Sequence, residues 1–329
     1  MIHNSFGFLS LLETNYLIFV IISVLCLILL KMFFNGGWCY LKADLSSNII
    51  IITGSNRGIG FHTALELART NATIILACRD IRNAEEARKT IVTQTNNNKI
   101  DILSLDLSEL RSIRTFAENF KAKYPRLDIL INNAGVNFPE RRLTKDGYES
   151  MIATNHLGHF LLTSLLLDTL KASQSSRIIT ISSIAHTYGY LNLEDINAEK
   201  YYNLHLTYGG TKLANILFTN ELAKRLKGTG VKTCSLHPGV IRSGFISDII
   251  KKNYVLKVLI ILLNPMWWFF TKNERQGAQT SLYCALLPHE HLENGRFYSD
   301  CHVKKTREIA NDQKMMKDLW EISEKMVKL

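Results

Sequence analysis

Residues 48–60 read NIIIITGSNRGIG, and this stretch decides the fold of the 329-residue chain. Its first six residues form a short run rich in β-branched side chains, which is typical of a buried strand. Gly54, Gly58 and Gly60 follow, and a helical pattern begins at Ile59. Glycines between a strand and a helix let the backbone approach a pyrophosphate, which the helix N-terminus stabilises. The stretch predicts a dinucleotide-binding turn, and an ordinary glycine-rich turn is the weaker alternative.

Downstream of this turn, short apolar runs alternate with amphipathic stretches of helical length. Strands are predicted at residues 48–53, 73–77, 100–105, 127–131, 177–181 and 231–236. Helices are predicted at residues 59–69, 84–93, 108–124, 145–153, 157–171 and 213–226, with Ser108 as the N-cap of the third. Apolar strands between helices are typical of a parallel sheet covered on both faces. The sequence therefore predicts a doubly wound α/β domain.

The N-terminus predicts a transmembrane helix. Residues 16–30, YLIFVIISVLCLILL, carry no charge, and a helix over residues 15–34 spans roughly 30 Å, the thickness of a bilayer core. A cleaved signal peptide is the alternative, but Glu13 precedes the apolar run where a basic residue is expected. Lys31 and Lys42 follow the run, which places the rest of the chain in the cytosol. We expect a membrane anchor at 1–37, a linker at 38–47 and one α/β domain at 48–329.

The charge balance and the cysteines indicate which classes of ligand and which cellular compartment suit this chain. Lys and Arg number 39 against 29 Asp and Glu, a net charge of +10, without a dense basic block interleaved with aromatics. The balance favours anionic ligands and an anionic membrane surface, not nucleic acid. The six cysteines show no C-x-x-C and no pairing pattern, as expected for free thiols in a reducing compartment. No residues have metal-ligand spacing, so no metal site is expected.

The end of the second predicted strand bears on the choice of nicotinamide cofactor. It reads ACRD over residues 77–80, and the guanidinium groups of Arg79 and Arg57 are placed to bind a 2′-phosphate. Asp80 is the alternative reader, because an acidic residue here holds a ribose 2′-hydroxyl. Its place just before a predicted helix suggests an N-cap instead. The arginines favour NADP(H) over NAD.

Tyr208 and Lys212 form the main catalytic candidate. They are four residues apart, so a helix places them on one face, where the ammonium lowers the pKa of the phenol from about 10. Tyr208 is therefore a candidate proton donor. Gly209 and Gly210 lie between them and cost the helix about 1 kcal/mol each against Ala. A close approach of cofactor or substrate is the reason we expect for them.

Five motifs follow one another along the chain: Gly54-x-x-x-Gly58-x-Gly60, Asn132-Asn-Ala-Gly135, Asn155, Ser182-Ser183 and Tyr208-x-x-x-Lys212. With them, residues 46–240 resemble the short-chain dehydrogenase/reductase family. The resemblance implies a single Rossmann-type domain with a parallel sheet of about seven strands, of which residues 295–299 form the last. Members of the family often dimerise, so a homodimer is a possible partner state.

The resemblance also implies residue roles. Tyr208 acts as general acid or base, Lys212 lowers the pKa of Tyr208 and holds the nicotinamide ribose, and Asn155 positions a water in the proton relay. Ser183 hydrogen-bonds the substrate oxygen, with Ser182 as its rival. His156, His159 and His186 are expected to be packing or solvent residues. Expected cofactor contacts are Gly54, Ser55, Asn56, Arg57, Gly58, Ile59, Gly60, Arg79, Asp106, Leu107, Asn133, Ala134, Gly135, Tyr208, Lys212, Pro238, Gly239 and Val240, followed by Ser243.

A second apolar stretch, YVLKVLIILLNPMWWFF, covers residues 254–270. Lys257 and Pro265 make it a poor transmembrane helix, whereas its tryptophans and flanking lysines suit a membrane interface. A helix buried in a dimer interface or in the core is the alternative. We assign residues 241–272 to a loop that faces substrate and membrane, which predicts a lipophilic substrate and membrane lipid as partners.

Four shorter matches extend the resemblance: Ser183-Ile-Ala-His186, Leu213-Ala-Asn-Ile-Leu-Phe218, His237-Pro-Gly-Val240 and Gly277-Ala-Gln-Thr280. They are similar to the microsomal, NADP-dependent retinol dehydrogenase group. That similarity implies a single-pass protein of the endoplasmic reticulum that interconverts a lipophilic aldehyde, such as retinal, and its alcohol. A reductase of hydroxysteroids or other lipid carbonyls is one alternative, and a non-catalytic cofactor-binding scaffold is another.

Overall fold

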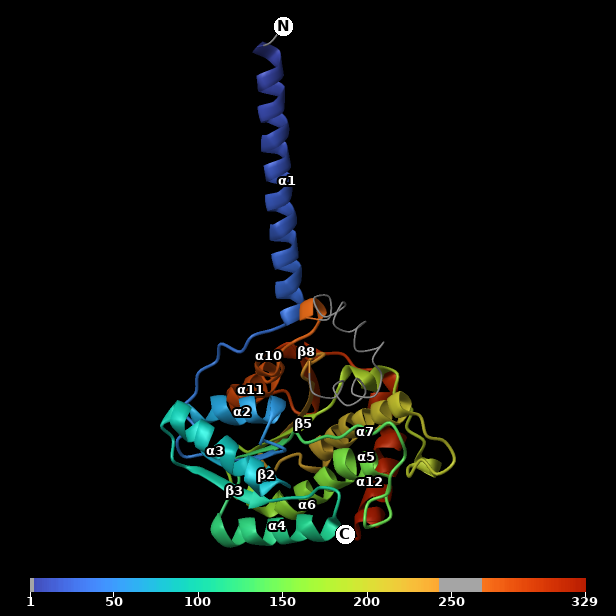
Figure 1. Cartoon of the computed structure of the whole chain (residues 1–329). Helices are drawn as coiled ribbons and strands as arrows, with labels where there is room; N and C mark the ends of the chain where they lie inside the picture. The colour runs from blue at the N-terminus through green and yellow to red at the C-terminus, as the bar shows by residue number, and fades with distance from the viewer. Residues whose placement is uncertain (1–2, 243–267) are drawn as a thin grey trace.

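The computed structural model describes residues 3–242 and 268–329, in which an eight-stranded sheet forms the centre (Figure 1). The strand order is β3-β2-β1-β4-β5-β6-β7-β8, and β1 to β7 run parallel while β8 pairs antiparallel with β7. The bounds are β1 (Ile49–Thr53), β2 (Thr73–Cys78), β3 (Ile100–Ser104), β4 (Ile129–Asn132), β5 (Arg177–Ile181), β6 (Lys232–His237), β7 (Arg296–Ser299) and β8 (His302–Lys304). The Rossmann-type sheet is confirmed, and β8 adds a short eighth strand to the seven expected.

Helices cover both faces of the sheet. One face packs against α2 (Gly58–Ala68), α3 (Ile81–Thr95) and α11 (Gln279–Leu286); the other packs against α4 (Leu110–Lys123), α6 (Gly158–Lys171) and α7 (Leu204–Arg225), backed by α12 (Gln313–Val327). In β1, Ile50 and Ile52 point into the first layer and Ile51 into the second, and all three are fully buried. Burial on both faces explains why this strand is continuously apolar.

Three local expectations are wrong. Ser108 does not cap α4: its amide and hydroxyl donate to Asp106 Oδ1, and the helix begins two residues later, at Leu110. No helix spans residues 145–153; a turn leads instead into α5 (Ser150–Ile152) and the π-helix η1 (Ala153–Leu157). The helix expected from residue 213 begins at Leu204, because Asn203 caps it by accepting from the amides of His205 and Leu206.

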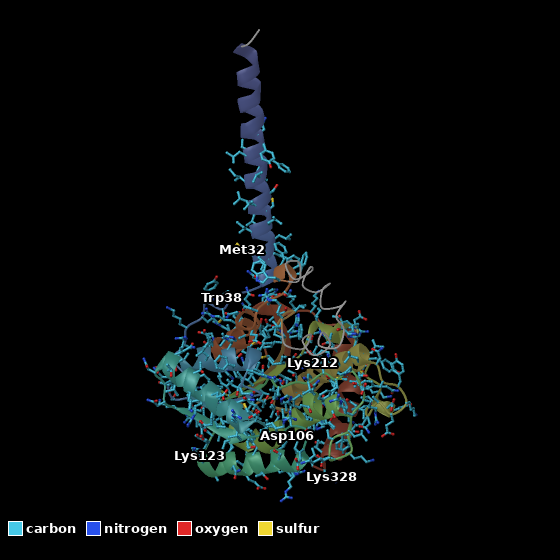
Figure 2. All side chains as sticks on the ribbon, viewed as in Figure 1. Met32, Trp38, Asp106, Lys123, Lys212 and Lys328 are labelled. Atoms are coloured by element: carbon cyan, nitrogen blue, oxygen red, sulfur yellow. The ribbon has the colours of Figure 1, made fainter. Side chains whose placement is uncertain are left out.

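The long helix α1 (His3–Asn35) stands outside the α/β domain (Figure 1). Within it, the span Asn15–Asn35 contains an 18-residue window with a mean hydropathy of 3.0, and none of that window is buried inside the protein. At 1.5 Å per residue these 21 residues extend about 32 Å, so the helix is long and apolar enough to cross a membrane. Met32 and Trp38 mark its junction with the domain, and Lys123 and Lys328 lie at the opposite end (Figure 2).

The topology also fixes where a ligand can bind. The chain crosses from one half of the sheet to the other between β3 and β4, so β1 and β4 are neighbours at the switch point. Ligands of open α/β sheets bind outside the carboxyl ends of the strands at this point. The segments that follow β1, β2, β4, β5 and β6 carry most of the predicted site residues.

Candidate active site

The glycine turn after β1 is packed against the segment that follows β4. Gly54 has a φ of +63°, and a Cβ atom there would lie 3.0 Å from Ala134 Cβ. At Gly60 a Cβ would lie 2.5 Å from Asn133 Nδ2, which donates to the Thr53 carbonyl at 2.7 Å. Larger residues would therefore separate the turn from its support. The backbone amides at the start of α2 remain available to a phosphate.

Ser55 differs from the other residues of the turn. Its side chain is fully buried, and the hydroxyl donates to the Ile52 carbonyl at 2.8 Å. The hydroxyl is directed into the protein, so it is not placed to contact a cofactor. Its hydrogen bond stabilises the turn from inside.

Thr53 and His159 link the switch point to Asn155, a connection that the sequence did not reveal. Thr53 Oγ1 accepts from the amides of Asn133 and Ala134, both at 2.9 Å, and lies 2.9 Å from His159 Nε2. His159 Nδ1 lies 3.1 Å from the Asn155 carbonyl oxygen, which can only accept. Burial lowers the pKa of His159 to about 3, so the ring is neutral. Nδ1 therefore carries the proton, and Nε2 accepts from the Thr53 hydroxyl.

Arg79 and Asp106 lie together at the edge formed by β2 and β3. The Arg79 guanidinium is 75% exposed and lies 3.8 Å from Asp106 Oδ2. The expected role of Asp80 as an N-cap is confirmed, because its Oδ1 accepts from the Asn83 amide at 3.0 Å and starts α3. The Asp80 carboxylate is thus engaged by its own helix. Arg57, just before α2, is exposed.

Asn155 is placed by the π-helix η1, a distortion that is frequent at functional sites. Its Oδ1 accepts from the Val136 amide at 2.7 Å, and its Nδ2 donates to Thr211 Oγ1 at 3.1 Å. The amide therefore joins the segment after β4 to the helix that carries Tyr208. A Cβ at Gly135 would lie 3.5 Å from both Asn155 Oδ1 and Lys212 Nζ, so these three residues converge.

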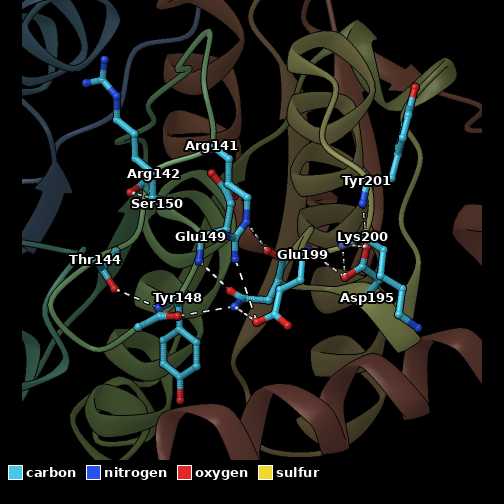
Figure 3. A network of polar contacts seen from close by, with 12 residues as sticks. Arg141, Arg142, Thr144, Tyr148, Glu149, Ser150, Asp195, Glu199, Lys200 and Tyr201 are labelled. Atoms are coloured by element: carbon cyan, nitrogen blue, oxygen red, sulfur yellow. Dashed lines mark hydrogen bonds and ion pairs between the residues drawn. The ribbon is translucent and has the colours of Figure 1, made fainter.

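A polar network supports the start of the helix that carries Asn155 (Figure 3). Glu149 is fully buried, and its carboxylate accepts from the amides of Met151 and Ile152. Its own amide donates to Asn197 Oδ1 at 2.6 Å, and Asn197 Nδ2 donates to Glu199 at 2.8 Å. Burial raises the pKa of Glu149, although the two amides oppose that shift. The network fixes the entry to α5 and η1.

The structure distinguishes the two candidate serines. Ser182 is buried and donates to the Lys212 carbonyl at 2.7 Å, so its hydroxyl supports the backbone of α7. Ser183 Oγ accepts from the Ala185 amide at 3.2 Å, and the hydroxyl lies close enough to Tyr208 to lower the pKa of the phenol. Lys212 Nζ lies 5.6 Å from the centroid of the Tyr208 ring and donates to the Ile181 carbonyl at 3.2 Å. Ser183, Tyr208 and Lys212 thus meet at the carboxyl end of β5.

The expected lowering of the Tyr208 pKa is not found in this structure. Burial raises the pKa of Tyr208 to about 12, against a smaller lowering by the neighbouring Ser183 hydroxyl. Burial also lowers the pKa of Lys212 to about 8. Desolvation disfavours the charged form of each group. At neutral pH the phenol therefore keeps its proton and is a donor.

Gly209 and Gly210 have a structural reason different from the one expected. A Cβ at Gly209 would lie 2.5 Å from the Ala185 carbonyl oxygen and 2.6 Å from Gly189 Cα, and one at Gly210 would overlap the Tyr190 carbonyl. The backbone after Ser183, including the 3₁₀ turn η2 (Ile184–Thr187), therefore packs directly on α7. The close approach is by the protein's own chain, and it brings Ser183 to Tyr208.

The segment after β6 forms the remaining described wall. Gly239 has a φ of +97°, Val240 is half exposed, and the Val240 carbonyl accepts from the Lys272 amide at 2.8 Å. Ser243 and most of the apolar stretch at 254–270 lie outside the described residues, so their predicted roles stay predictions. Leu107 is buried, and its carbonyl lies against Gly158 at the start of α6.

Comparison with known proteins identifies the family. The sequence profile described as short chain dehydrogenase matches residues 48–253, more than half of the chain. The chain belongs to the short chain dehydrogenase family. This membership confirms the resemblance that the five motifs carried, and it covers the cofactor turn, Asn155, Ser183, Tyr208 and Lys212.

Relatives of this short chain dehydrogenase span nearly its whole length. Retinol dehydrogenase 12 of Bos taurus is 45% identical over 294 residues, covering 89% of this chain and 90% of its own. Human retinol dehydrogenase 11 is 44% identical, covering 88% of both chains, and human retinol dehydrogenase 13 is 42% identical, covering 92% and 91%. The chain is thus similar to retinol dehydrogenases, as the four shorter motifs suggested.

Solved structures agree on the fold of the dehydrogenase. An uncharacterised protein from Mycobacterium paratuberculosis is 35% identical and superposes with a TM-score of 0.71 over 89% of this chain and 98% of its own. A short chain dehydrogenase from Shigella flexneri, solved in complex with NADP, is 22% identical with a TM-score of 0.59 over 79% and 99%. At 22% identity, the similarity to the second structure supports the fold alone.

Proposed function

We propose that this protein is a membrane-anchored, NADP(H)-dependent oxidoreductase that interconverts a lipophilic aldehyde and its alcohol, with retinal and retinol as the substrate pair. The observation that carries the proposal is the meeting of Ser183, Tyr208 and Lys212 at the carboxyl end of β5. The naming of its relatives as retinol dehydrogenases supports the substrate class.

The residues present fit a nicotinamide cofactor. Gly54 and Gly60 let the turn pack closely on Ala134 and Asn133, and at Gly58 an added Cβ would meet nothing nearer than Glu274 Oε1 at 3.7 Å, which leaves the start of α2 open to a diphosphate. Gly135 lies beside Asn155 and Lys212. Asn56, Gly58 and Ile59 belong to the same turn, Asn133 and Ala134 border it, and Pro238 and Gly239 follow β6. The bound cofactor supplies or accepts the hydride.

The chain's own groups handle the proton and the oxygen. In the reducing direction Tyr208 donates its phenolic proton to the carbonyl oxygen, and Ser183 donates a hydrogen bond to that oxygen. The ammonium of Lys212 stabilises the phenolate that forms, and the group holds its proton below a pKa of about 8. Asn155 ties the Val136 segment to Thr211 beside them and so keeps the relay in place.

Arg79 and Arg57 support the choice of NADP(H). Both are exposed near the cofactor turn, whereas both carboxylate oxygens of Asp80 accept from Asn83 in the helix cap. The Asp106 carboxylate beside Arg79 holds the guanidinium near the adenosine end of the site. Comparing kcat/KM for NADPH and NADH tests this, and a preference for NADH would overturn the argument from Arg79.

The setting supports a substrate that enters from a membrane. An apolar helix joins the domain beside residues 268–272, and the exposed side chains of Trp268 and Phe270 lie at the same junction. We propose a single-pass protein of the endoplasmic reticulum, with an anchor at 1–37, a linker at 38–47 and a domain at 48–329 that faces the cytosol. Residues 241–272 would face substrate and lipid, and a homodimer fits the family.

The decisive experiment is NADPH oxidation by the full chain in detergent, with retinal, steroid ketones and medium-chain aldehydes as substrates. A preference for steroid ketones would favour the hydroxysteroid alternative, and turnover of none of them would favour a scaffold. Ser183→Ala and Ser182→Ala form a matched pair for the mechanism. Loss of one oxyanion partner costs on the order of 100-fold in kcat, so we expect that loss only at Ser183. Full activity of Tyr208→Phe would refute the proton-donor role.

A further inference from the structure

Lys272 is a buried cation that the proposed chemistry does not use. The residue is 5% exposed, and its ammonium donates to Asp300 Oδ1 at 2.6 Å. Although burial alone would raise it, the hydrogen bond from Lys272 and the charges of Lys272 and Lys304 hold the pKa of Asp300 at about 2. A buried ion pair of this kind is costly to break, because the remaining charge loses its partner.

The backbone and the stem of Lys272 both support the turn after β6. The Lys272 amide donates to Val240, and its carbonyl accepts from Arg242 at 2.9 Å. Gly239, with a φ of +97°, faces the side chain: a Cβ there would lie 2.6 Å from Lys272 Cδ and 2.8 Å from Cε. The position of this lysine therefore sets the position of residues 238–240, the predicted wall beside the nicotinamide.

The end of the membrane helix contacts the same lysine from the other side. Gly36 has a φ of +71°, and a Cβ there would overlap both Lys272 Nζ and Asp300 Oδ1; one at Gly37 would overlap the Asp300 carbonyl. Two glycines, one in the anchor junction and one in the cofactor-side turn, thus enclose a single ion pair. Only glycine fits both positions without moving it.

Further contacts fix α1 on the segment that precedes Lys272. Lys31 Nζ donates to the carbonyls of Trp268 at 2.8 Å and Phe269 at 3.0 Å. The ring of Phe34 packs edge-on against Phe270, with centroids 4.8 Å apart. The lower end of the long helix lies directly beside this short segment (Figure 1). The helix is docked on the domain and not merely tethered to it.

We propose that Lys272 is a positioning residue that couples the docked end of the membrane helix to the cofactor-side turn at residues 238–240. A change at the anchor junction then alters cofactor binding through Lys272 and Asp300. The proposal rests on the proposed function only in taking residues 238–240 as a wall of the nicotinamide site.

Gly36→Ala tests the coupling from the anchor side, far along the chain from the turn, and Lys272→Met tests it at the centre while keeping the apolar stem. The NADPH dissociation constant, from the fluorescence of bound NADPH, is measured on the full chain in detergent together with KM and kcat for a short soluble aldehyde. We expect weaker NADPH binding in both variants, and a fall in kcat/KM of roughly 10- to 100-fold, as for misplacements near 1 Å.

Two matched controls separate coupling from general damage. Met32→Ala changes an exposed side chain in the same part of α1, and Lys123→Met breaks an exposed ion pair with Asp101 at the far end of the domain. Both should leave the NADPH dissociation constant unchanged. Wild-type NADPH binding in Gly36→Ala and in folded Lys272→Met would overturn the proposal. Because binding is measured without turnover, an inactive wild-type protein would defeat the proposed function and leave this test intact.

Discussion

Gly209→Ala is the sharpest test of how the active site is assembled. A Cβ at this position would lie 2.5 Å from the Ala185 carbonyl oxygen, whereas Cβ contacts under 3.0 Å essentially do not occur. The backbone after Ser183 must therefore retreat by about 0.5 Å. Because both colliding partners, Ala185 and Gly189, present backbone atoms, no side-chain rotation relieves the overlap.

The energetic and the catalytic consequences differ in size. Ala in place of Gly favours a helix by about 1 kcal/mol, while overpacking costs about 1–3 kcal/mol. The free energy of unfolding should therefore fall by no more than about 2 kcal/mol. The retreat separates Ser183 from Tyr208, and since a 1 Å misplacement can cost about 100-fold, half of that should lower kcat/KM roughly tenfold.

The assay is kcat/KM for aldehyde reduction, with the thermal midpoint as the stability readout. Gly228→Ala is the control: its φ is +85° and nothing lies within 4 Å of the added Cβ. That variant should lose about 1 kcal/mol from the left-handed backbone and keep wild-type kcat/KM. A Gly209→Ala enzyme that is more stable and equally active would refute the reasoning.

Three further predictions follow from single groups. Lys212→Met should abolish activity yet raise the free energy of unfolding at pH 7 by up to about 3 kcal/mol, because the substitution removes a buried charge whose folded-state pKa of about 8 lies below the unfolded value. Denaturant unfolding should show this gain shrink as the pH rises from about 8 towards 10.5. In the wild-type enzyme, kcat/KM for reduction should decline above about pH 8 as Lys212 loses its proton, and a profile flat to pH 10 would contradict this. Arg79→Gln should lower the preference for NADPH over NADH by about 10-fold or more, whereas Asp80→Asn should leave that preference unchanged. A changed preference in Asp80→Asn would show instead that Asp80 binds the ribose 2′-hydroxyl.

The sequence predicted those features that depend on neighbouring residues. The strand, turn and helix at 48–60 and the Asp80 cap follow local patterns, and they were found as predicted. The prediction that Ser108 caps α4 was wrong because a distant carboxylate, that of Asp146, accepts from the first amide of the helix. Ser108 itself donates to Asp106.

Features built from distant segments could not be read from the chain. The partner of Gly209 is a backbone carbonyl 24 residues upstream, at Ala185, and no local pattern marks it. Thr53 was visible only as the last residue of a strand, although its hydroxyl joins Asn133, Ala134 and His159. One signal was available in retrospect: paired glycines inside a helix imply a close backbone neighbour when the helix must still form.

Burial of Tyr208 and Lys212 favours carbonyl reduction over alcohol oxidation near neutral pH. The same desolvation that raises the pKa of the phenol to about 12 lowers that of Lys212 to about 8, so near neutral pH the first group is a proton donor and the second a cation. Reduction of a carbonyl begins from these protonation states, because the phenol gives its proton to an oxygen that gains charge. Oxidation of an alcohol needs the phenolate, which is scarce until the pH rises well above neutral. The rate of alcohol oxidation should therefore climb with pH where the rate of aldehyde reduction is level, and parallel profiles for the two directions would show that another group carries the proton.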